Sequence, residues 1–209
     1  MCTSFYIRHD EKEIKEIIEW FQDSFLFRKF VKAGKEVKTS GEIRPTNVVP
    51  VIALNRNGER TAFPMQWGFH LNDRSPLINA RTETAAEKPT FKKAWAGHRC
   101  VVPASWYFEW EHLIGDDGKK KTGAKYMIRP EGSDLTWLCG LYRMEDGLPA
   151  FTVLTREPSS ELRQIHDRMP LILPKEKIGD WIDPDADPRE LLPFSLTDMV
   201  FEEAVYKKL

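Results

Sequence analysis

The chain has 209 residues, with 31 Lys and Arg against 32 Asp and Glu, a formal net charge of −1 and 41% hydrophobic residues. This length supports one buried core and does not require a second, so we expect a single domain over residues 1–209. The balanced charge argues against a protein that coats nucleic acid by bulk electrostatic attraction, so any contact with DNA must be local.

The sequence contains no apolar run of signal-peptide or membrane-span length. Its three cysteines are odd in number and form no CxxC pair, which suits a reducing compartment. We therefore expect a cytoplasmic protein without a membrane partner; separately, we expect a monomer. Cys100 and Cys139 lie in apolar runs, where we expect buried and inert thiols.

The first half of the chain is predicted to hold a strand, one long helix and a hairpin. Asp10 followed by Glu13 resembles a capping box, and the helical spacing of the apolar residues after it predicts one amphipathic helix over roughly residues 11–31. The polar stretch 32–47 is predicted as a loop. Predicted strands cover residues 3–7, 48–54 and 61–69, with a hairpin turn between the last two.

The second half alternates apolar, β-branched and aromatic runs with turn chemistry. It predicts strands at 99–112, 125–130, 135–144 and 149–157, then helices at 159–165 and 174–182. We expect an α+β fold: a single domain with a curved, largely antiparallel, barrel-like β-sheet and flanking helices.

Cys2 is chemically special because of its position. If Met1 is removed, Cys2 carries a free α-amine and a thiol on adjacent carbons. The reference pKa of an α-amine is about 7.7–8.0, so roughly a tenth of it is unprotonated at neutral pH. Such a residue can attack an acyl group through sulfur, as N-terminal nucleophiles do, or close a thiazolidine ring on an aldehyde through both atoms.

Glu109 stands among aromatic residues in the run SWYFEWEH. Strand alternation puts it on the same face as Tyr107 and opposite Trp110. It is either a surface residue of an amphipathic strand or a carboxylate in a half-dry site, where a raised pKa would suit an acid or base.

Two further segments offer polar groups. Asn79 and Arg81 either mark an exposed strand end or orient a substrate oxygen and hold a phosphate, respectively. His166 is either a structural histidine or, at a helix end beside Asp167, a proton shuttle near neutral pH. The spacing of His and Cys predicts no metal site, and the absence of glycine-rich phosphate motifs predicts no nucleotide cofactor.

In chain order, the motifs MC, PTNVVP, WGF, NARTET, SWYFEW and IHDRMPLIL resemble the SOS-response-associated peptidase family. The resemblance spans residues 2 to about 174. Members of that family guard abasic sites in single-stranded DNA, so the resemblance implies this partner. It also implies removal of the initiator methionine, a thiazolidine link from the exposed cysteine to the ring-opened sugar, and associated autopeptidase and lyase activity.

The resemblance implies a role for each matching residue. Cys2 would be the nucleophile, Asn79 would stabilise the sugar, Glu109 and His166 would move protons, and Arg81 would hold a phosphate. The further residues expected at the DNA are Asn47, Pro50, Trp67, Arg44 and Lys92. Lys93 and Arg99 are additional candidate phosphate contacts.

The chain also departs from the family pattern. The family usually begins Cys-Gly-Arg, whereas this chain has Thr3 and Ser4, so one cationic contact is missing. Few aromatic residues follow Trp67, and losing one stacking platform worth roughly 1–3 kcal/mol would weaken noncovalent DNA binding by about tenfold or more. An N-terminal-nucleophile amidohydrolase or amidotransferase and a noncatalytic DNA-binding module remain alternatives.

Overall fold

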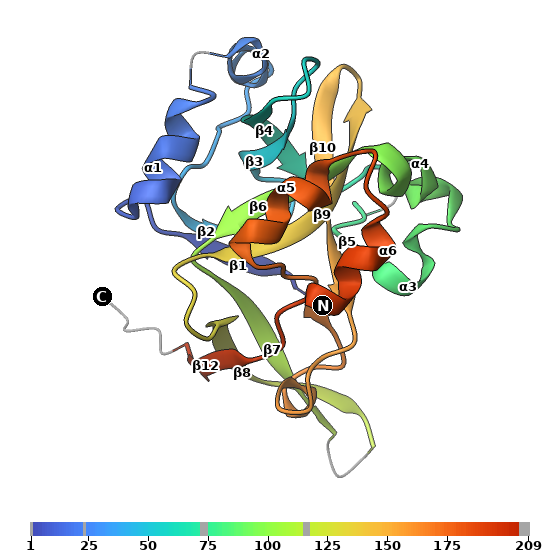
Figure 1. The fold of residues 1–209 in the computed structure, drawn as a ribbon. Helices are drawn as coiled ribbons and strands as arrows, with labels where there is room; N and C mark the ends of the chain where they lie inside the picture. The colour runs from blue at the N-terminus through green and yellow to red at the C-terminus, as the bar shows by residue number, and fades with distance from the viewer. Residues whose placement is uncertain (1, 23, 72–74, 115–117, 205–209) are drawn as a thin grey trace.

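The strands form two sheets (Figure 1). The computed structural model describes residues 2–22, 24–71, 75–114 and 118–204. The α+β class with a barrel-like, largely antiparallel sheet is confirmed.

One sheet closes into a barrel because β10 pairs with both β4 and β9. The pairing of β10 with β4 is parallel, and the other pairings around the barrel are antiparallel. The barrel strands are β3 (Val48–Leu54), β4 (Arg60–Trp67), β6 (Arg99–Ala104), β9 (Thr136–Glu145) and β10 (Leu148–Arg156). Two short strands, β5 (Asn79–Arg81) and β11 (Met169–Pro170), also pair with β10.

The second sheet has five strands, all antiparallel to their neighbours, in the order β12-β8-β7-β1-β2. They are β1 (Ser4–Ile7), β2 (Gly41–Ile43), β7 (Trp106–Ile114), β8 (Lys120–Pro130) and β12 (Met199–Glu203). In Figure 1 the β7–β8 ribbon projects away from the barrel.

The predicted strand over residues 99–112 is wrong in one respect, because the chain changes sheet within it. β6 belongs to the barrel and β7 to the second sheet, and Ser105 separates them. Ser105 is buried; its N–H donates to the Tyr6 carbonyl at 2.8 Å, and its hydroxyl accepts the Arg8 N–H at 2.9 Å. This crossing brings Glu109 beside the N-terminal strand.

The predicted helix over residues 11–31 is also wrong, because it is two helices. α1 spans Lys12–Glu19 and α2 spans Phe25–Lys32. Ser24 starts the second helix, since its hydroxyl accepts the Phe27 N–H at 3.1 Å. The spacing of hydrophobic residues alone does not reveal the break between α1 and α2.

The predicted capping box at the start of α1 is absent as well. The Asp10 carboxylate accepts hydrogen bonds from Arg8, at 2.7 and 3.2 Å, instead of capping the helix. Glu11 occupies the N-cap without a side-chain cap.

The C-terminal helices are shorter than predicted. Only a 3₁₀ turn, Leu162–Gln164, forms within 159–165, whereas 174–182 is helical as a 3₁₀ turn followed by α5 (Ile178–Ile182). The helical elements without a sequence prediction are α3 (Thr82–Ala85), α4 (Pro89–Gly97), α6 (Pro188–Leu191) and the 3₁₀ turn Leu192–Phe194. The pair α1 and α2 and the pair α3 and α4 lie on opposite sides of the barrel in Figure 1.

The predicted burial of two cysteines is confirmed. Cys100 and Cys139 are fully buried, and burial raises the pKa of both thiols. None of the helices in the described ranges has the length and apolar character needed to cross a bilayer.

Candidate functional site

Cys2 lies just before β1 with its thiol inside the protein. Its side chain is fully buried, and Sγ lies 3.7 Å from the Ser4 carbonyl oxygen, to which the thiol donates. Burial raises the pKa of the thiol, and the charge of Glu109 raises it further. At neutral pH the sulfur is therefore a protonated thiol. Met1 lies outside the described residues.

Asn79 connects the barrel to this N-terminal segment. β5 runs parallel to β10, with Asn79 opposite Val153, and Asn79 Nδ2 donates to the Cys2 carbonyl at 2.9 Å. Asn79 Oδ1 is buried and accepts no hydrogen bond from any residue that the structure describes. The amide thus anchors Cys2 through its nitrogen and keeps an acceptor for another group.

Glu109 shares a face of β7 with Tyr107, as strand alternation predicts, and the structure shows that both side chains are buried. Glu109 and Tyr107 are 3% and 1% exposed, whereas Trp110 is 40% exposed. Burial raises the pKa of Glu109 to about 7. Both the acid and the carboxylate forms are therefore present near neutral pH.

His166 faces Glu109 from a segment that is distant in sequence. Both side chains are buried, and His166 Nε2 lies 3.6 Å from Glu109 Oε1. On the other edge of the ring, Nδ1 lies 2.8 Å from Asp167 Oδ1 and 3.0 Å from the Arg168 backbone N–H. The imidazolium donates to Asp167, whereas a neutral Nδ1 accepts from Arg168, so either protonation state has a partner.

The expected helix dipole is not the feature that supports this histidine. His166 follows a single 3₁₀ turn, and so few aligned peptide dipoles add up to only a small helix dipole. Asp167 supplies the negative charge instead, from an exposed position.

Glu109, His166 and Asp167 border a cleft of about 490 Å³, whereas Cys2 and Asn79 are not among its lining residues. Its lining residues are Thr3, Arg81, Glu109, Trp110, His112, Thr122, His166, Asp167 and Arg168. Arg168 is fixed by two 2.8 Å hydrogen bonds to the Glu83 carboxylate and by one to the Thr155 carbonyl. Arg81 is exposed on the same cleft, so a cationic side chain is available to an anion entering it.

The other residues expected at the DNA lie outside this lining. Arg44 and Lys92 are exposed, and Arg44 lies 3.5 Å from Glu42 in an ion pair. Asn47 stabilises a turn, because its side-chain oxygen accepts the Arg44 N–H at 3.0 Å. Lys93 is exposed on α4 beside Lys92.

Three of the expected contacts are buried. Pro50 is buried opposite Pro64 in the barrel. Trp67 is fully buried, its Nε1 donates to the Ile78 carbonyl at 2.9 Å, and its ring packs against the core, which leaves no face for a base. Arg99 is 1% exposed and donates to backbone carbonyls, so it serves the fold and does not reach a phosphate.

Two site residues were not identified from the sequence. The Tyr107 hydroxyl is buried without a hydrogen-bond partner in the described chain, and burial followed by the charges of Cys2 and Glu109 raises its pKa. His112 lies with its ring centroid 3.9 Å from that of His166. Strand alternation does put Tyr107 on the face of Glu109, although it assigns Tyr107 no role, and nothing local in sequence joins His112 to His166.

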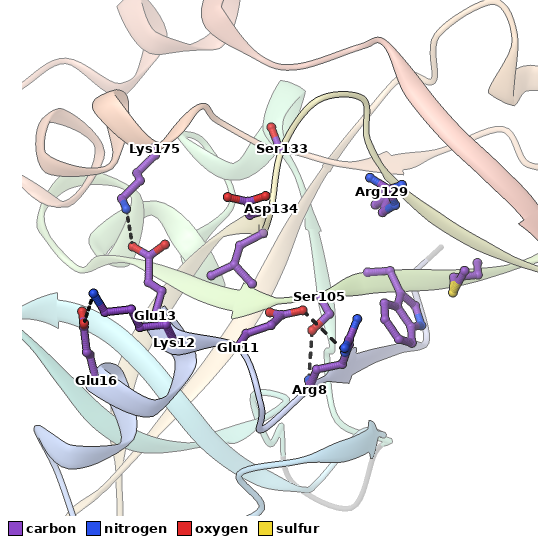
Figure 2. A pocket seen from close by; sticks show the side chains of 13 residues that line it. Arg8, Glu11, Lys12, Glu13, Glu16, Ser105, Arg129, Ser133, Asp134 and Lys175 are labelled. Carbon is purple, nitrogen blue, oxygen red and sulfur yellow. Dashed lines mark hydrogen bonds and ion pairs between the residues drawn. The ribbon is translucent and has the colours of Figure 1, made fainter.

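A larger hollow of about 750 Å³ shares no lining residue with this cleft (Figure 2). Its cations are largely matched by acids: Lys175 pairs with Glu13 at 2.7 Å, and Lys12 lies 3.9 Å from Glu16. The mixed charge gives this hollow no net attraction for a polyanion.

Comparison with known proteins identifies a family whose sequences match this chain and a solved structure with a similar fold. The profile described as SOS response associated peptidase (SRAP) matches residues 1–206. The abasic site processing protein YobE of Bacillus subtilis is 32% identical over 221 residues, which cover 95% of this chain and 92% of that protein. The abasic site processing protein YedK of Escherichia coli is 30% identical, over 69% of this chain and 67% of that protein.

A crystal structure of a Bacteroides thetaiotaomicron protein superposes with a TM-score of 0.72 at 22% identity. The match covers 98% of this chain and 92% of that one. It supports the fold.

Proposed function

This chain belongs to the SOS response associated peptidase family, and on that premise we propose that it processes abasic sites in single-stranded DNA through a covalent link to Cys2. The observation that carries the proposal is the arrangement around Cys2. Asn79 holds its carbonyl, Glu109 acts on its thiol electrostatically, and His166 backs Glu109.

The first step uses the α-amine that removal of Met1 frees. The amine adds to the aldehyde carbon of the ring-opened sugar and forms a carbinolamine. Glu109, in its acid form, donates a proton to the carbinolamine hydroxyl, which leaves as water and yields a protonated imine (iminium) beside the Glu109 carboxylate. Asn79 Oδ1, which has no partner in the described chain, is the acceptor for a sugar hydroxyl or for the amine.

The second step uses the thiol. The Cys2 sulfur adds to the iminium carbon while its S–H proton passes to the Glu109 carboxylate, which restores the acid form, and a neutral five-membered thiazolidine closes. Overall, each covalent link to the DNA releases one water molecule. A raised thiol pKa suits this order, because the neutral thiol leaves the first attack to the amine.

His166 keeps Glu109 supplied with protons. Its Nε2 faces Glu109 at 3.6 Å, and its other nitrogen has Asp167 as a partner for the charged ring. A pair of groups that can both hold and release a proton near neutral pH is what the two opposite transfers require.

Binding of the DNA backbone is proposed to be local and modest. Arg81 is the exposed cation of the cleft and the proposed phosphate contact, whereas Thr3 and Ser4 stand where the family usually carries a glycine and an arginine. Noncovalent binding to DNA weakens as salt rises, but a closed thiazolidine does not depend on counterion release.

The same site is proposed to remove Met1 and to cleave the strand slowly. Glu109 and His166 would move protons when the bond between Met1 and Cys2 is hydrolysed, and the imine intermediate allows β-elimination of the 3′ phosphate. Retention of Met1 by Glu109→Gln, when the unaltered chain loses it in the same expression host, would support self-processing. Loss of Met1 from both would contradict it.

The test of the covalent link is intact-mass spectrometry before and after incubation with a single-stranded oligonucleotide that carries one abasic site. We expect a species without Met1 that gains the mass of the oligonucleotide less one water. Cys2→Ala should gain nothing, and Cys139→Ala is the matched control, since Cys139 is a buried thiol of the barrel strand β9. An adduct that survives Cys2→Ala overturns the proposal, as does a processed protein that gains no mass.

A further inference from the structure

His112, His166 and Asp167 bring three donor atoms of metal-ligand type together. Each residue offers one atom, and these atoms all lie within 4.8 Å of one another. A zinc ion binds imidazole nitrogens and carboxylate oxygens at about 2.0–2.2 Å. Two ligand atoms of one zinc ion are therefore closer to each other than the 4.8 Å limit found here. Two of the three side chains, His112 and Asp167, are exposed, so protein packing leaves them room to adjust around an ion.

The fold itself directs His112 towards His166. The register of β7 against β8 shifts between Trp110 and His112, which is a β-bulge or an equivalent irregularity. The His112 backbone N–H also donates to the Ile165 carbonyl at 2.9 Å, which ties β7 to the segment that carries His166. A bulge re-aims the side chain that follows it, and here that side chain borders the cleft.

The charges of the cleft allow a cation at this point. The Arg168 guanidinium is engaged by the Glu83 carboxylate through two hydrogen bonds, so much of its charge is offset. Asp167 and Glu109 contribute negative charge on either side of His166. The open cleft leaves room for a water molecule as a further ligand.

We propose that His112, His166 and Asp167 form a binding site for a divalent transition-metal ion, with Zn²⁺ as the best match. Two imidazoles and one carboxylate favour Zn²⁺, Cu²⁺ or Ni²⁺ over Mg²⁺ and Ca²⁺, which prefer all-oxygen sites. Such a site was not predicted from the sequence, because its two histidines come from β7 and from the segment after Leu162–Gln164.

The site also provides a means of regulation, and this part rests on the proposed function. A metal ion held by His112, His166 and Asp167 lies in the cleft that Glu109 also lines, where it obstructs the approach of an abasic sugar to Glu109. Zn²⁺ is therefore a reversible inhibitor of abasic-site capture.

The experiment measures metal binding without DNA. The untagged full-length protein, treated with chelator and dialysed, is titrated with ZnCl₂ by calorimetry and with CoCl₂ by visible absorption. We expect one ion per chain and no heat from MgCl₂. Loss of even an outer-shell partner weakens metal binding by roughly 10–100-fold, so His112→Ala and Asp167→Asn should each weaken it by at least about tenfold. His9→Ala should bind as the unaltered chain does, since His9 is exposed beyond the end of β1 that lies away from Cys2.

Absence of saturable Zn²⁺ binding, or an affinity that His112→Ala leaves unchanged, overturns the site. A second arm repeats the adduct assay with Zn²⁺, which should slow capture in the unaltered chain and much less in His112→Ala. If Zn²⁺ binds but capture is equally fast, the regulatory role is overturned. If the metal-free protein captures no abasic DNA while Zn²⁺ still binds, the proposed function fails and the metal site stands.

Discussion

The imidazole of His166 and the carboxylate of Glu109 lie 3.6 Å apart inside the protein, although one follows β10 and the other is in the middle of β7. The hydrogen bond from the His112 N–H to the Ile165 carbonyl fixes the two segments side by side. The pair is thus a product of sheet packing, and both side chains line the same cleft.

Glu109→Gln should slow adduct formation by roughly 10²-fold or more, because an amide cannot transfer the protons of either step. The rate is measured by quenching the reaction with abasic oligonucleotide and resolving the adduct by denaturing electrophoresis. Glu111→Gln, two residues along the same strand, is the control and should react within about twofold of the unaltered chain. Equal slowing by both variants would indicate a general effect of lost charge.

Glu109 should also make stability depend on pH. Its pKa is about 7 in the folded protein, against an ordinary value of 4.5, so the folded state holds a proton that the unfolded state has lost between these values. The free energy of unfolding therefore falls as pH rises through this window, by about 3 kcal/mol in total from this group.

Glu109→Gln removes this titration. In urea denaturation the variant should gain stability relative to the unaltered chain by about 3 kcal/mol between pH 4 and pH 8. A difference between the two proteins that stays constant over this range would contradict the burial of the carboxylate. The gain in stability at neutral pH, set beside the loss of activity, would separate the chemical role of Glu109 from a structural one.

Arg81→Ala should weaken noncovalent binding of single-stranded DNA and lower its salt dependence. Each phosphate contact to a single strand contributes about 0.7 to the slope of log affinity against log salt, so one contact should be lost. The measurement uses fluorescence anisotropy in the Cys2→Ala background, where no covalent link interferes. Arg44→Ala, outside the cleft, is the comparison, and an identical change in both slopes would place the phosphate elsewhere.

Arg99→Met should destabilise the protein by about 3 kcal/mol or more, because it leaves several buried carbonyls without a donor. The guanidinium donates to the carbonyls of Trp181, Trp95, Ala96, Asp183 and Ala186. Chemical denaturation measures the loss, and Arg44→Met should stay within about 0.5 kcal/mol of the unaltered chain. A small effect of Arg99→Met would restore Arg99 as a candidate DNA contact.

Part of the fold and of the candidate site could be predicted from patterns among neighbouring residues. Strand alternation placed Glu109 on the same face as Tyr107, and the position of Cys2 behind Met1 identified a residue that can offer an α-amine beside a thiol. Apolar runs located most barrel strands, because the period of two and the enrichment in β-branched residues are properties of neighbouring residues.

The residues that local patterns misassigned share one physical cause. Trp67 and Arg99 carry a ring and a charge that also suit DNA, and only the barrel decides that both are buried. The break of the long helix at Ser24 and the change of sheet at Ser105 depend on hydrogen bonds that compete with continued periodicity.

Composition, strand periodicity and the chemistry of position two were thus determined by the sequence alone, because each depends on a residue and its near neighbours. The burial of the Cys2 thiol, the contact of Glu109 with His166 and the approach of His112 were decided only by the tertiary structure. Those features depend on which strands pair and how the chain crosses between two sheets, and that pairing is a balance of packing over the whole molecule.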